Sequence, residues 1–217
     1  MTMSLFDGPA NTEMSEESLG PGATILRCFA VPEETAILSA IQHVIAAAPF
    51  RHMITPGGFR MSVAMTNCGV LGWVSDRSGY RYDVMDPEGS QPWPPMPDPF
   101  LRLATRAAAK AGFQKFVPDA CLINRYDPGA RLTLHQDKNE LDYDQPIVSV
   151  SLGLPATFLF GGLKRADKTI RVQLRHGDVV VWGGPARLRY HGVLQLKEGH
   201  HPLTGGHRIN LTFRKAG

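Results

Sequence analysis

The sequence predicts an α+β domain that is mainly β, in which two N-terminal helices precede a sandwich or jelly roll of short strands. The chain has 217 residues, enough for one domain with a substantial core. Two segments before residue 112 carry apolar residues at helical spacing. After residue 119, short apolar runs bounded by turn residues follow one another, a rhythm typical of sandwiches and jelly rolls.

The N-terminal part predicts a tail, one strand and two helices. Residues 1 to about 20 are rich in Ser, Glu and Gly and are expected to form a flexible tail, leaving 21–217 as a single domain. Ala23 to Phe29 predicts a strand, and Pro32 is suited to the first turn of a helix that ends before Pro49. The second helix is expected from about Pro97 to Ala111, with Gly112 as its C-terminal cap.

The jelly-roll core is expected at about 119–215, where apolar runs alternate with turns such as Asp127-Pro128-Gly129. The expected strands are Asp119–Tyr126, Arg131–His135, Ile147–Leu152, Thr157–Phe160, Thr169–Leu174, Asp178–Trp182, Arg187–Val193 and Ile209–Phe213.

The segment between the helices, about 50–97, shows little regular pattern and interleaves aromatic residues with arginines. A long irregular segment inside a compact domain is often a lid or a binding loop. Aromatic rings can stack on bases while arginines pair with phosphates, as in nucleic-acid sites. An ordinary hydrophobic flap, with arginines kept for solubility, explains the same residues equally well.

Composition narrows the class of protein. The net charge of +3 permits nucleic-acid binding, and it suits a small footprint on a single strand better than a long duplex surface. Three scattered cysteines predict neither a disulfide framework nor a zinc site, which favours a reducing cytoplasm. We find no signal peptide and no apolar run of membrane-spanning length, so no membrane partner is expected.

A metal site is predicted by His135, Asp137 and His191. Residues two apart on a strand point to the same face, so His135 and Asp137 aim at one point while Gln136 points away. Two imidazoles and one carboxylate leave open positions on a divalent metal, as in non-haem Fe(II) oxygenases. A His-x-Asp pair is weak by itself, because it occurs by chance in many chains.

The strand from His207 to Arg214 strengthens this interpretation, because apolar residues alternate in it with Arg208, Asn210 and Arg214. Buried arginines are costly without an anion, and a guanidinium can hold a carboxylate by two parallel hydrogen bonds. An edge strand with one apolar and one wet face would show the same alternation. Spacing alone does not choose between a co-substrate anchor and such an edge.

Taken together, these motifs resemble the AlkB family of Fe(II)- and 2-oxoglutarate-dependent dioxygenases, from about Gly22 to Ala216. The segments that carry the resemblance are Met53–Gly58, Met61–Gly69, Leu71–Trp73, Asp119–Tyr126, His135–Lys138, Phe160–Arg165, Gly177–Gly184 and His207–Arg214. The resemblance implies a double-stranded β-helix (jelly roll) with flanking N-terminal helices and a nucleotide-recognition lid.

The resemblance also implies roles for individual residues. His135, Asp137 and His191 match the iron ligands and catalytic centre. Residues that match the 2-oxoglutarate site are Asn124, Tyr126, Arg208, Asn210 and Arg214, with Trp182 as a wall of that pocket. Residues that match the damaged-base site are Thr55, Met65, Trp73, Tyr80, Asn139 and Arg165.

The implied activity is oxidative demethylation of 1-methyladenine and 3-methylcytosine in DNA, preferentially single-stranded, with release of formaldehyde, succinate and CO2. The cofactors are Fe(II), 2-oxoglutarate as co-substrate, and O2. The implied partner is alkylated single-stranded DNA, or RNA, and a monomer is expected. Two alternatives are a related oxygenase acting on RNA, protein or a small molecule, and a jelly-roll binding module without catalysis.

One position departs from the family pattern. Members that resemble this chain carry an aspartate after the lysine that matches Lys138, whereas this chain has Asn139. An amide accepts a hydrogen bond from an exocyclic amine but offers no negative charge to a cationic base. We therefore expect a changed preference among lesions, unless Glu140 or Asp142 compensates.

Overall fold

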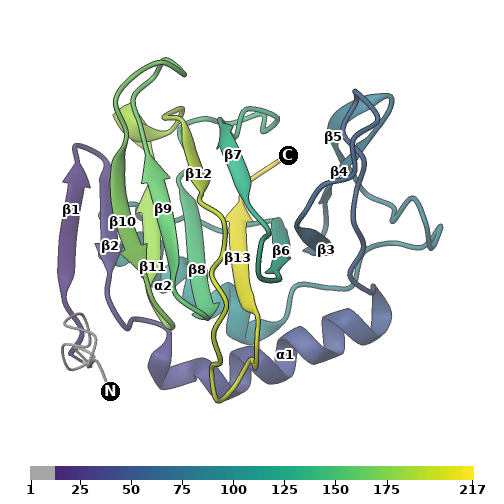
Figure 1. Ribbon diagram of the computed structural model, residues 1–217, viewed down its shortest axis with the longest axis horizontal. Coiled ribbons are helices and arrows are strands. Elements are labelled where there is room, and N and C mark those ends of the chain that lie inside the picture. The colour runs from purple at the N-terminus through teal and green to yellow at the C-terminus, as the bar shows by residue number, and fades with distance from the viewer. Residues whose placement is uncertain (1–12) are drawn as a thin grey trace.

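Two antiparallel sheets face each other in the computed structural model, which describes residues 13–217 (Figure 1). The larger sheet has seven strands, in the order β1 (Glu16–Gly20), β2 (Ala23–Leu26), β11 (Val179–Trp182), β8 (Ile147–Gly153), β13 (Arg208–Arg214), β6 (Ala120–Tyr126) and β3 (Ala64–Gly69). The smaller has four, in the order β10 (Ile170–Leu174), β9 (Ala156–Phe160), β12 (His191–Val193) and β7 (Leu132–His135). The expected jelly roll is confirmed.

Two helices cover the outer face of the larger sheet, α1 (Glu34–Ala47) and α2 (Asp98–Lys110). Short 3-10 turns, Val31–Glu33 and Gly184–Ala186, precede α1 and β12. Both predicted helices are confirmed, and their apolar stripes pack on the outward side chains of β8 and β13. In the described part of the chain, no helix has the length and apolar character that crossing a membrane requires.

Strand β13 separates two environments. Ile209, Leu211 and Phe213 lie in the core beneath the helices. The intervening side chains point between the two sheets, because successive residues of a strand face opposite sides. All seven residues of β13 are buried, so its polar face is not the wet face of an edge strand.

The segment 50–97 was predicted to have little regular structure, and this is wrong for three strands. Strand β3 joins the larger sheet beside β6, and β4 (Gly72–Asp76) pairs with β5 (Gly79–Asp83) in a hairpin. Figure 1 shows this hairpin standing beside the two sheets rather than within them. We call β4, β5 and their turn the lid hairpin. Sequence pattern missed β3 because it is buried on both faces and carries polar residues there.

Two further expectations need correction. The flexible tail was expected to reach about residue 20, but Glu16–Gly20 form the edge strand β1, paired with β2. Its residues show no apolar alternation, because an exposed edge is held by backbone pairing and by the bonds from Arg27 to Glu17. Residues 1–12 lie outside the described part. The strand expected at Arg187–Val193 is only His191–Val193, and β7 ends at His135, before Asp137.

Candidate active site

His135, Asp137 and His191 converge between the sheets, with one potential ligand atom from each lying within 4.8 Å of the others. Strand β7 carries His135, and β12 places His191 directly opposite it. Gly192 allows this close approach, since a Cβ there would lie 2.7 Å from the carbonyl oxygen of Leu132. Gln136 points away, as predicted, and donates to the carbonyl of Leu188 at 2.6 Å.

Hydrogen bonds made by the Nδ1 atoms of the two imidazoles orient these rings as metal ligands. The Nδ1 of His135 donates to the carbonyl of Thr133 at 2.9 Å, and that of His191 donates to the carbonyl of Arg189 at 3.1 Å. A carbonyl can only accept, so Nδ1 carries a hydrogen in both rings, and Nε2 is the atom left to bind a metal. Two causes, burial first and the neighbouring His135 second, lower the pKa of His191 to about 4. The ring of His191 is therefore neutral at pH 7.

Asp137 is ionised by its surroundings. Its Oδ2 accepts two hydrogen bonds from Arg214, from Nε at 3.0 Å and from Nη2 at 2.8 Å. Burial raises the pKa of Asp137, but Arg214, and the two imidazoles when they are protonated, lower it by more, so the pKa lies well below its usual range. Oδ1 lies 3.6 Å from the Nε2 of His135. The donor set of two imidazoles and one carboxylate fits a divalent iron.

Glu140 extends this cluster and was not recognised from the sequence as part of it. Its side chain is 2% exposed and accepts hydrogen bonds from Tyr82 of the lid hairpin at 2.6 Å and from Arg187 at 3.0 Å. Arg214 lies 3.4 Å from the same carboxylate. Each charged side chain of this cluster therefore has a partner, as a buried charge requires. No sequence motif marks this network, because its members meet only in the folded chain.

Arg208 has the properties of an anion anchor. The residue is 1% exposed, and its Nη2 donates to the hydroxyl of Ser151 at 2.9 Å. Its Nε and Nη1 are buried and have no hydrogen-bond partner among residues 13–217. Burial lowers the pKa of the guanidinium, and no carboxylate offsets it. Two orphaned donors on a buried cation fit one carboxylate of a dicarboxylic acid.

The other residues matched to the co-substrate site differ in which of their polar atoms lack a hydrogen-bond partner within the protein. Tyr126 lies under Arg208, whose guanidinium carbon is 4.9 Å from the ring centre. Asn210 donates to Ser149 and to the carbonyl of Val150, so its two N–H groups are used within the protein. Asn124 keeps an unpaired Oδ1, and Trp182 an unpaired indole N–H, within the described residues. Arg214 is engaged with Asp137, so a direct contact from it to the co-substrate stays a prediction.

The lid hairpin presents two aromatic rings. Trp73 and Tyr80 stack with centroids 5.6 Å apart and an interplanar angle of 14°. Asn67 of β3 holds the backbone of Trp73 from both sides, accepting from its N–H and donating to its carbonyl, each at 3.0 Å. The indole N–H of Trp73 donates to Asn139 Oδ1 at 3.3 Å. This bond ties the lid hairpin to the loop that follows Asp137.

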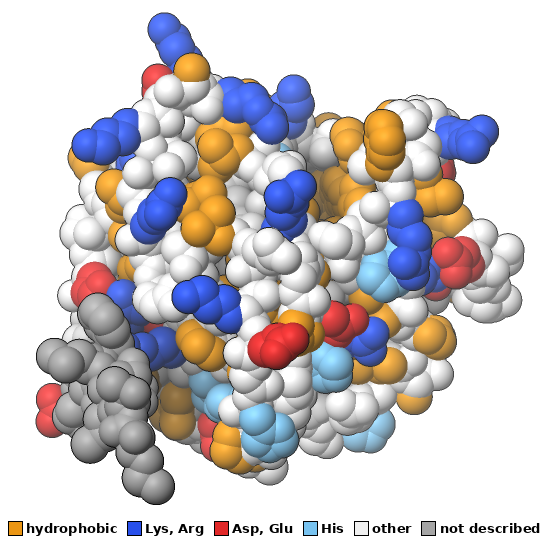
Figure 2. All heavy atoms as spheres, in the orientation of Figure 1, with side chains coloured by type: hydrophobic (Ala, Val, Ile, Leu, Met, Phe, Trp, Pro, Cys, Tyr) orange, Lys and Arg blue, Asp and Glu red, His pale blue; other side chains and the backbone are white. Residues whose placement is uncertain are grey.

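Three other residues matched to the base site are not part of this stacked pair. Met65 is 2% exposed and packs in the core between the sheets, while Thr55 belongs to a loop in which it bonds Phe59. Arg165 is exposed and, with Arg131, borders a hollow of about 360 Å³ on the outer side of β7 and β9. Lys and Arg side chains are spread over the upper half of the face in Figure 2, among hydrophobic ones. A role of Thr55, Met65 and Arg165 in binding a substrate stays a prediction.

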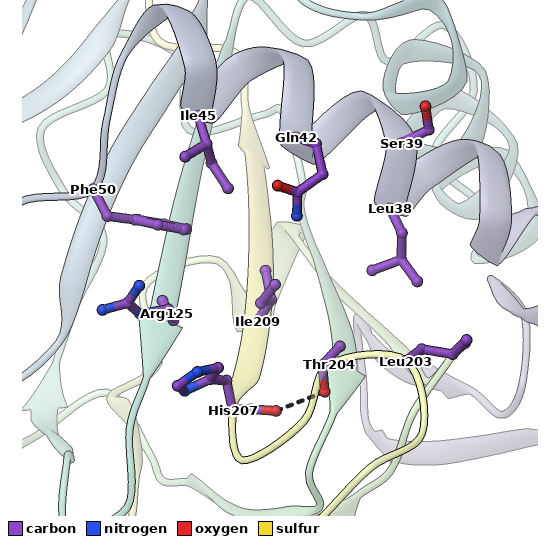
Figure 3. Close-up of a pocket in the computed structure, with 10 residues that line it drawn as sticks. All are labelled: Leu38, Ser39, Gln42, Ile45, Phe50, Arg125, Leu203, Thr204, His207 and Ile209. Carbon is purple, nitrogen blue, oxygen red and sulfur yellow. Dashed lines mark hydrogen bonds between the residues drawn. The ribbon is translucent and has the colours of Figure 1, made fainter.

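A larger hollow, of about 480 Å³, lies away from these groups (Figure 3). It is lined by Ile209 of β13, Arg125 of β6, and residues of α1. These side chains face the helices, so the larger sheet separates this hollow from Arg208 and Tyr126. Of the polar groups that line it, Arg125 and His207 both lie within ion-pair distance of Asp127.

A metal-ligand set with open positions, beside a buried cation that lacks its anion, defines the class of protein. On a jelly roll, these are the features of a non-haem Fe(II) oxygenase that uses an acidic co-substrate. The sequence comparisons agree. The model of the 2OG-Fe(II) oxygenase superfamily matches residues 22–214. The alpha-ketoglutarate-dependent dioxygenase AlkB of Escherichia coli (strain K12) is 59% identical over 213 residues, which cover 98% of this chain and 99% of that relative.

More distant proteins extend the comparison. The DNA N(6)-methyladenine demethylase ALKBH1A of Arabidopsis thaliana is 37% identical over 131 residues, covering 59% of this chain and 36% of that protein. The solved structure of OsALKBH1 superposes with a TM-score of 0.81 at 29% identity, covering 93% of this chain and all of that one. The chain belongs to the AlkB family of 2-oxoglutarate- and Fe(II)-dependent oxygenases. It is a dioxygenase whose cofactors are Fe(II), 2-oxoglutarate and O2.

Proposed function

We propose that this dioxygenase removes N-methyl groups from alkylated bases, including 1-methyladenine and 3-methylcytosine, in single-stranded DNA. The observation that carries the proposal is the bond from Trp73 to Asn139, which fixes a stacked aromatic pair beside the loop that follows Asp137. A flipped base needs a stacking surface next to the oxidising centre. The Arabidopsis relative named as a DNA N(6)-methyladenine demethylase supports DNA as the substrate.

We assign the metal to His135 Nε2, one oxygen of Asp137 and His191 Nε2. Arg208 would hold one carboxylate of 2-oxoglutarate through its two free donors, with Tyr126 beneath it. Arg214 keeps Asp137 ionised and oriented. When bound, Fe(II) with 2-oxoglutarate and O2 supplies the oxidation that converts the N-methyl group to formaldehyde, with succinate and CO2 as co-products.

The protein's own contribution is to select and position the base. Trp73 and Tyr80 supply the stacking surface, and the ring of His135, whose side chain is 33% exposed, supplies a second one. Thr55, Asn139 and Arg165 are proposed to complete the contacts with the nucleotide and its backbone, and the buried Met65 is proposed to support this site from the core. A methylated base that cannot pair costs less to extrude, which itself favours damaged bases. The modest net charge of +3 suits a short single strand. We further propose that the enzyme acts as a monomer in the cytoplasm.

The test is incubation of an oligonucleotide carrying one 3-methylcytosine with Fe(II), 2-oxoglutarate and O2, followed by mass spectrometry. Removal of one methyl group lowers the mass by about 14 units per lesion, with one formaldehyde and one succinate released. His191→Ala serves as the inactive control. An unchanged mass, while 2-oxoglutarate is still consumed, would refute a base as substrate. The same sequence as RNA, tested in parallel, separates the related RNA oxygenase from the DNA enzyme.

A further inference from the structure

Arg187 joins the two segments that carry the metal ligands. It lies four residues before His191, and its guanidinium reaches the loop that begins at Asp137. We propose that Arg187 is a positioning residue, which sets the affinity of the site for iron although it is not a ligand. Its charge neutralises Glu140, and this leaves Arg214 to Asp137. The inference rests on the metal assignment of the proposed function, and not on which base is demethylated.

One guanidinium holds both ends and the middle of this loop. Arg187 Nη1 donates to the carbonyl of Asp137 at 2.8 Å, and Nε donates to the carbonyl of Gln145 at 3.0 Å. Nη2 donates to Oε2 of Glu140 at 3.0 Å. The guanidinium also lies over the ring of Tyr143, with its carbon 5.4 Å from the ring centre. The planar fork of arginine suits this arrangement, because an ammonium presents its donors from a single point.

Burial strengthens the attraction between Arg187 and Glu140. The two side chains are 3% and 2% exposed. Opposite charges withdrawn from water attract each other strongly, and removing one of them leaves the other uncompensated. Tyr82 also bonds Glu140, but a hydroxyl brings no positive charge. Of the two cations beside Glu140, Arg187 lies nearer, at 3.0 Å against 3.4 Å for Arg214.

Arg214 lies between two carboxylates. Its Nε is 3.0 Å from Oδ2 of Asp137 and 3.4 Å from Oε1 of Glu140, and its Nη2 bonds Asp137 as well. With Arg187 present, each acid is paired with a cation, Glu140 with Arg187 and Asp137 with Arg214. Without Arg187, both carboxylates compete for Arg214. Glu140 then draws Arg214 away from Asp137, and this ligand loses the bonds that orient its carboxylate.

Other contacts keep the two ligand-bearing segments together when Arg187 is replaced. The side chain of Gln136 donates to the carbonyl of Leu188 at 2.6 Å. His135 and His191 are register partners across β7 and β12. The strands therefore keep their pairing without the guanidinium, and a change in iron affinity reports the arrangement of charges around Asp137.

The experiment measures the affinity for Fe(II) by anaerobic titration of the metal-free protein, which needs no turnover. Arg187→Met should lower the affinity about 10–100-fold, the effect typical of losing a group that orients a metal ligand. Arg187→Lys keeps a positive charge beside Glu140 and should lower the affinity less. Arg27→Lys is the matched control, because Arg27 pairs with Glu17 and Asp178 outside the site. This variant should bind iron normally.

The double variant Arg187→Met with Glu140→Gln distinguishes positioning from a merely structural role. It removes the competing charge, so Arg214 returns to Asp137 and most of the lost iron affinity should be regained. Hydrogen–deuterium exchange in 138–145 should be faster in the single and the double variant alike, because both lose the bonds to the two backbone carbonyls. Iron affinity and loop mobility therefore change independently, which a structural role does not predict.

The outcomes separate this inference from the metal assignment. If Asp137→Ala binds Fe(II) as the natural protein does, the assigned ligand set is wrong. If Asp137→Ala loses iron while Arg187→Met binds it normally, the ligand set stands and the role of Arg187 is refuted. A double variant that binds iron no better than Arg187→Met, or an Arg187→Lys variant that loses as much affinity, also refutes this role. The loss would then come from the loop and not from the charge of Glu140.

Discussion

The hydroxyl of Tyr82 donates a hydrogen bond of 2.6 Å to Glu140, and this bond joins the lid hairpin to the buried charges behind the metal ligands. Glu140 in turn lies 3.4 Å from Arg214, which bonds Asp137. Three contacts, through Glu140 and Arg214, therefore connect a lid residue to a metal ligand. Losing any member leaves a buried partner without its counterpart.

Tyr82→Phe removes one hydrogen bond and keeps the ring. We expect the free energy of unfolding to fall by about 1–3 kcal/mol, because a bond to a buried carboxylate is lost. We also expect faster amide exchange in 72–83, measured by hydrogen–deuterium exchange. Tyr143→Phe is the matched control, since the hydroxyl of Tyr143 donates to a backbone carbonyl at a 41% exposed side chain. Equal exchange in both variants would show that Tyr82 does not hold the hairpin.

Arg208→Met tests the anion anchor. A buried cation with two orphaned donors destabilises the ligand-free protein, so we expect its melting temperature to be unchanged or raised by the substitution. The stabilisation that 2-oxoglutarate gives the natural protein should disappear, because two charge-assisted bonds are lost. The affinity of the Arg208→Met variant for 2-oxoglutarate should fall by about 10²–10³-fold. Calorimetric titration checks the affinity, and a variant that binds 2-oxoglutarate normally contradicts the anchor.

Asp137→Ala tests the metal site and its support together. We expect loss of bound iron, measured by metal analysis, and a decrease in the free energy of unfolding of about 3–5 kcal/mol, because the buried charge of Arg214 loses its main partner. The double variant Asp137→Ala with Arg214→Met should regain part of this stability without regaining iron. Full iron content in the single variant would remove Asp137 from the ligand set.

The stacked pair of His176 and His201, with centroids 4.4 Å apart, predicts a pH dependence of stability. Burial, and next the nearby His176, lower the pKa of His201, although Glu34 acts in the opposite sense and His200 in the same one. The imidazole of His201 therefore binds a proton more readily in the unfolded chain than in the folded one. Stability should fall as pH drops below the ordinary histidine pKa of about 6.5. His201→Gln should flatten this slope in denaturant unfolding between pH 7 and 5; an unchanged slope contradicts it.

Sequence reasoning reached the parts of the site that obey local periodicity. The polar face of β13 alternates with an apolar one, and the ligands His135 and Asp137 are two residues apart, although β7 ends at His135 and Asp137 lies just beyond it. Glu140 and Tyr82 were missed because they are 58 residues apart and meet only in the folded chain. The inward turn of Glu140 also could not be read from its position next to Asn139.

The strands of the lid segment were missed for a related reason. In β3, Thr66 and Asn67 are polar yet buried, because each bonds a backbone group of a neighbouring segment. Such residues break the alternation that sequence pattern relies on. Edge strand β1 was missed because its backbone pairing leaves no mark on its side chains.

The alternation in β13 has a consequence for how this enzyme tolerates change. One residue inserted within the strand would rotate every later side chain by half a turn, sending guanidinium groups under the helices and aliphatic groups toward the iron. Folding and oxidation would be lost in the same step. Insertions and deletions of a single residue in this strand should therefore have no intermediate phenotype, whereas point substitutions on either face can be graded.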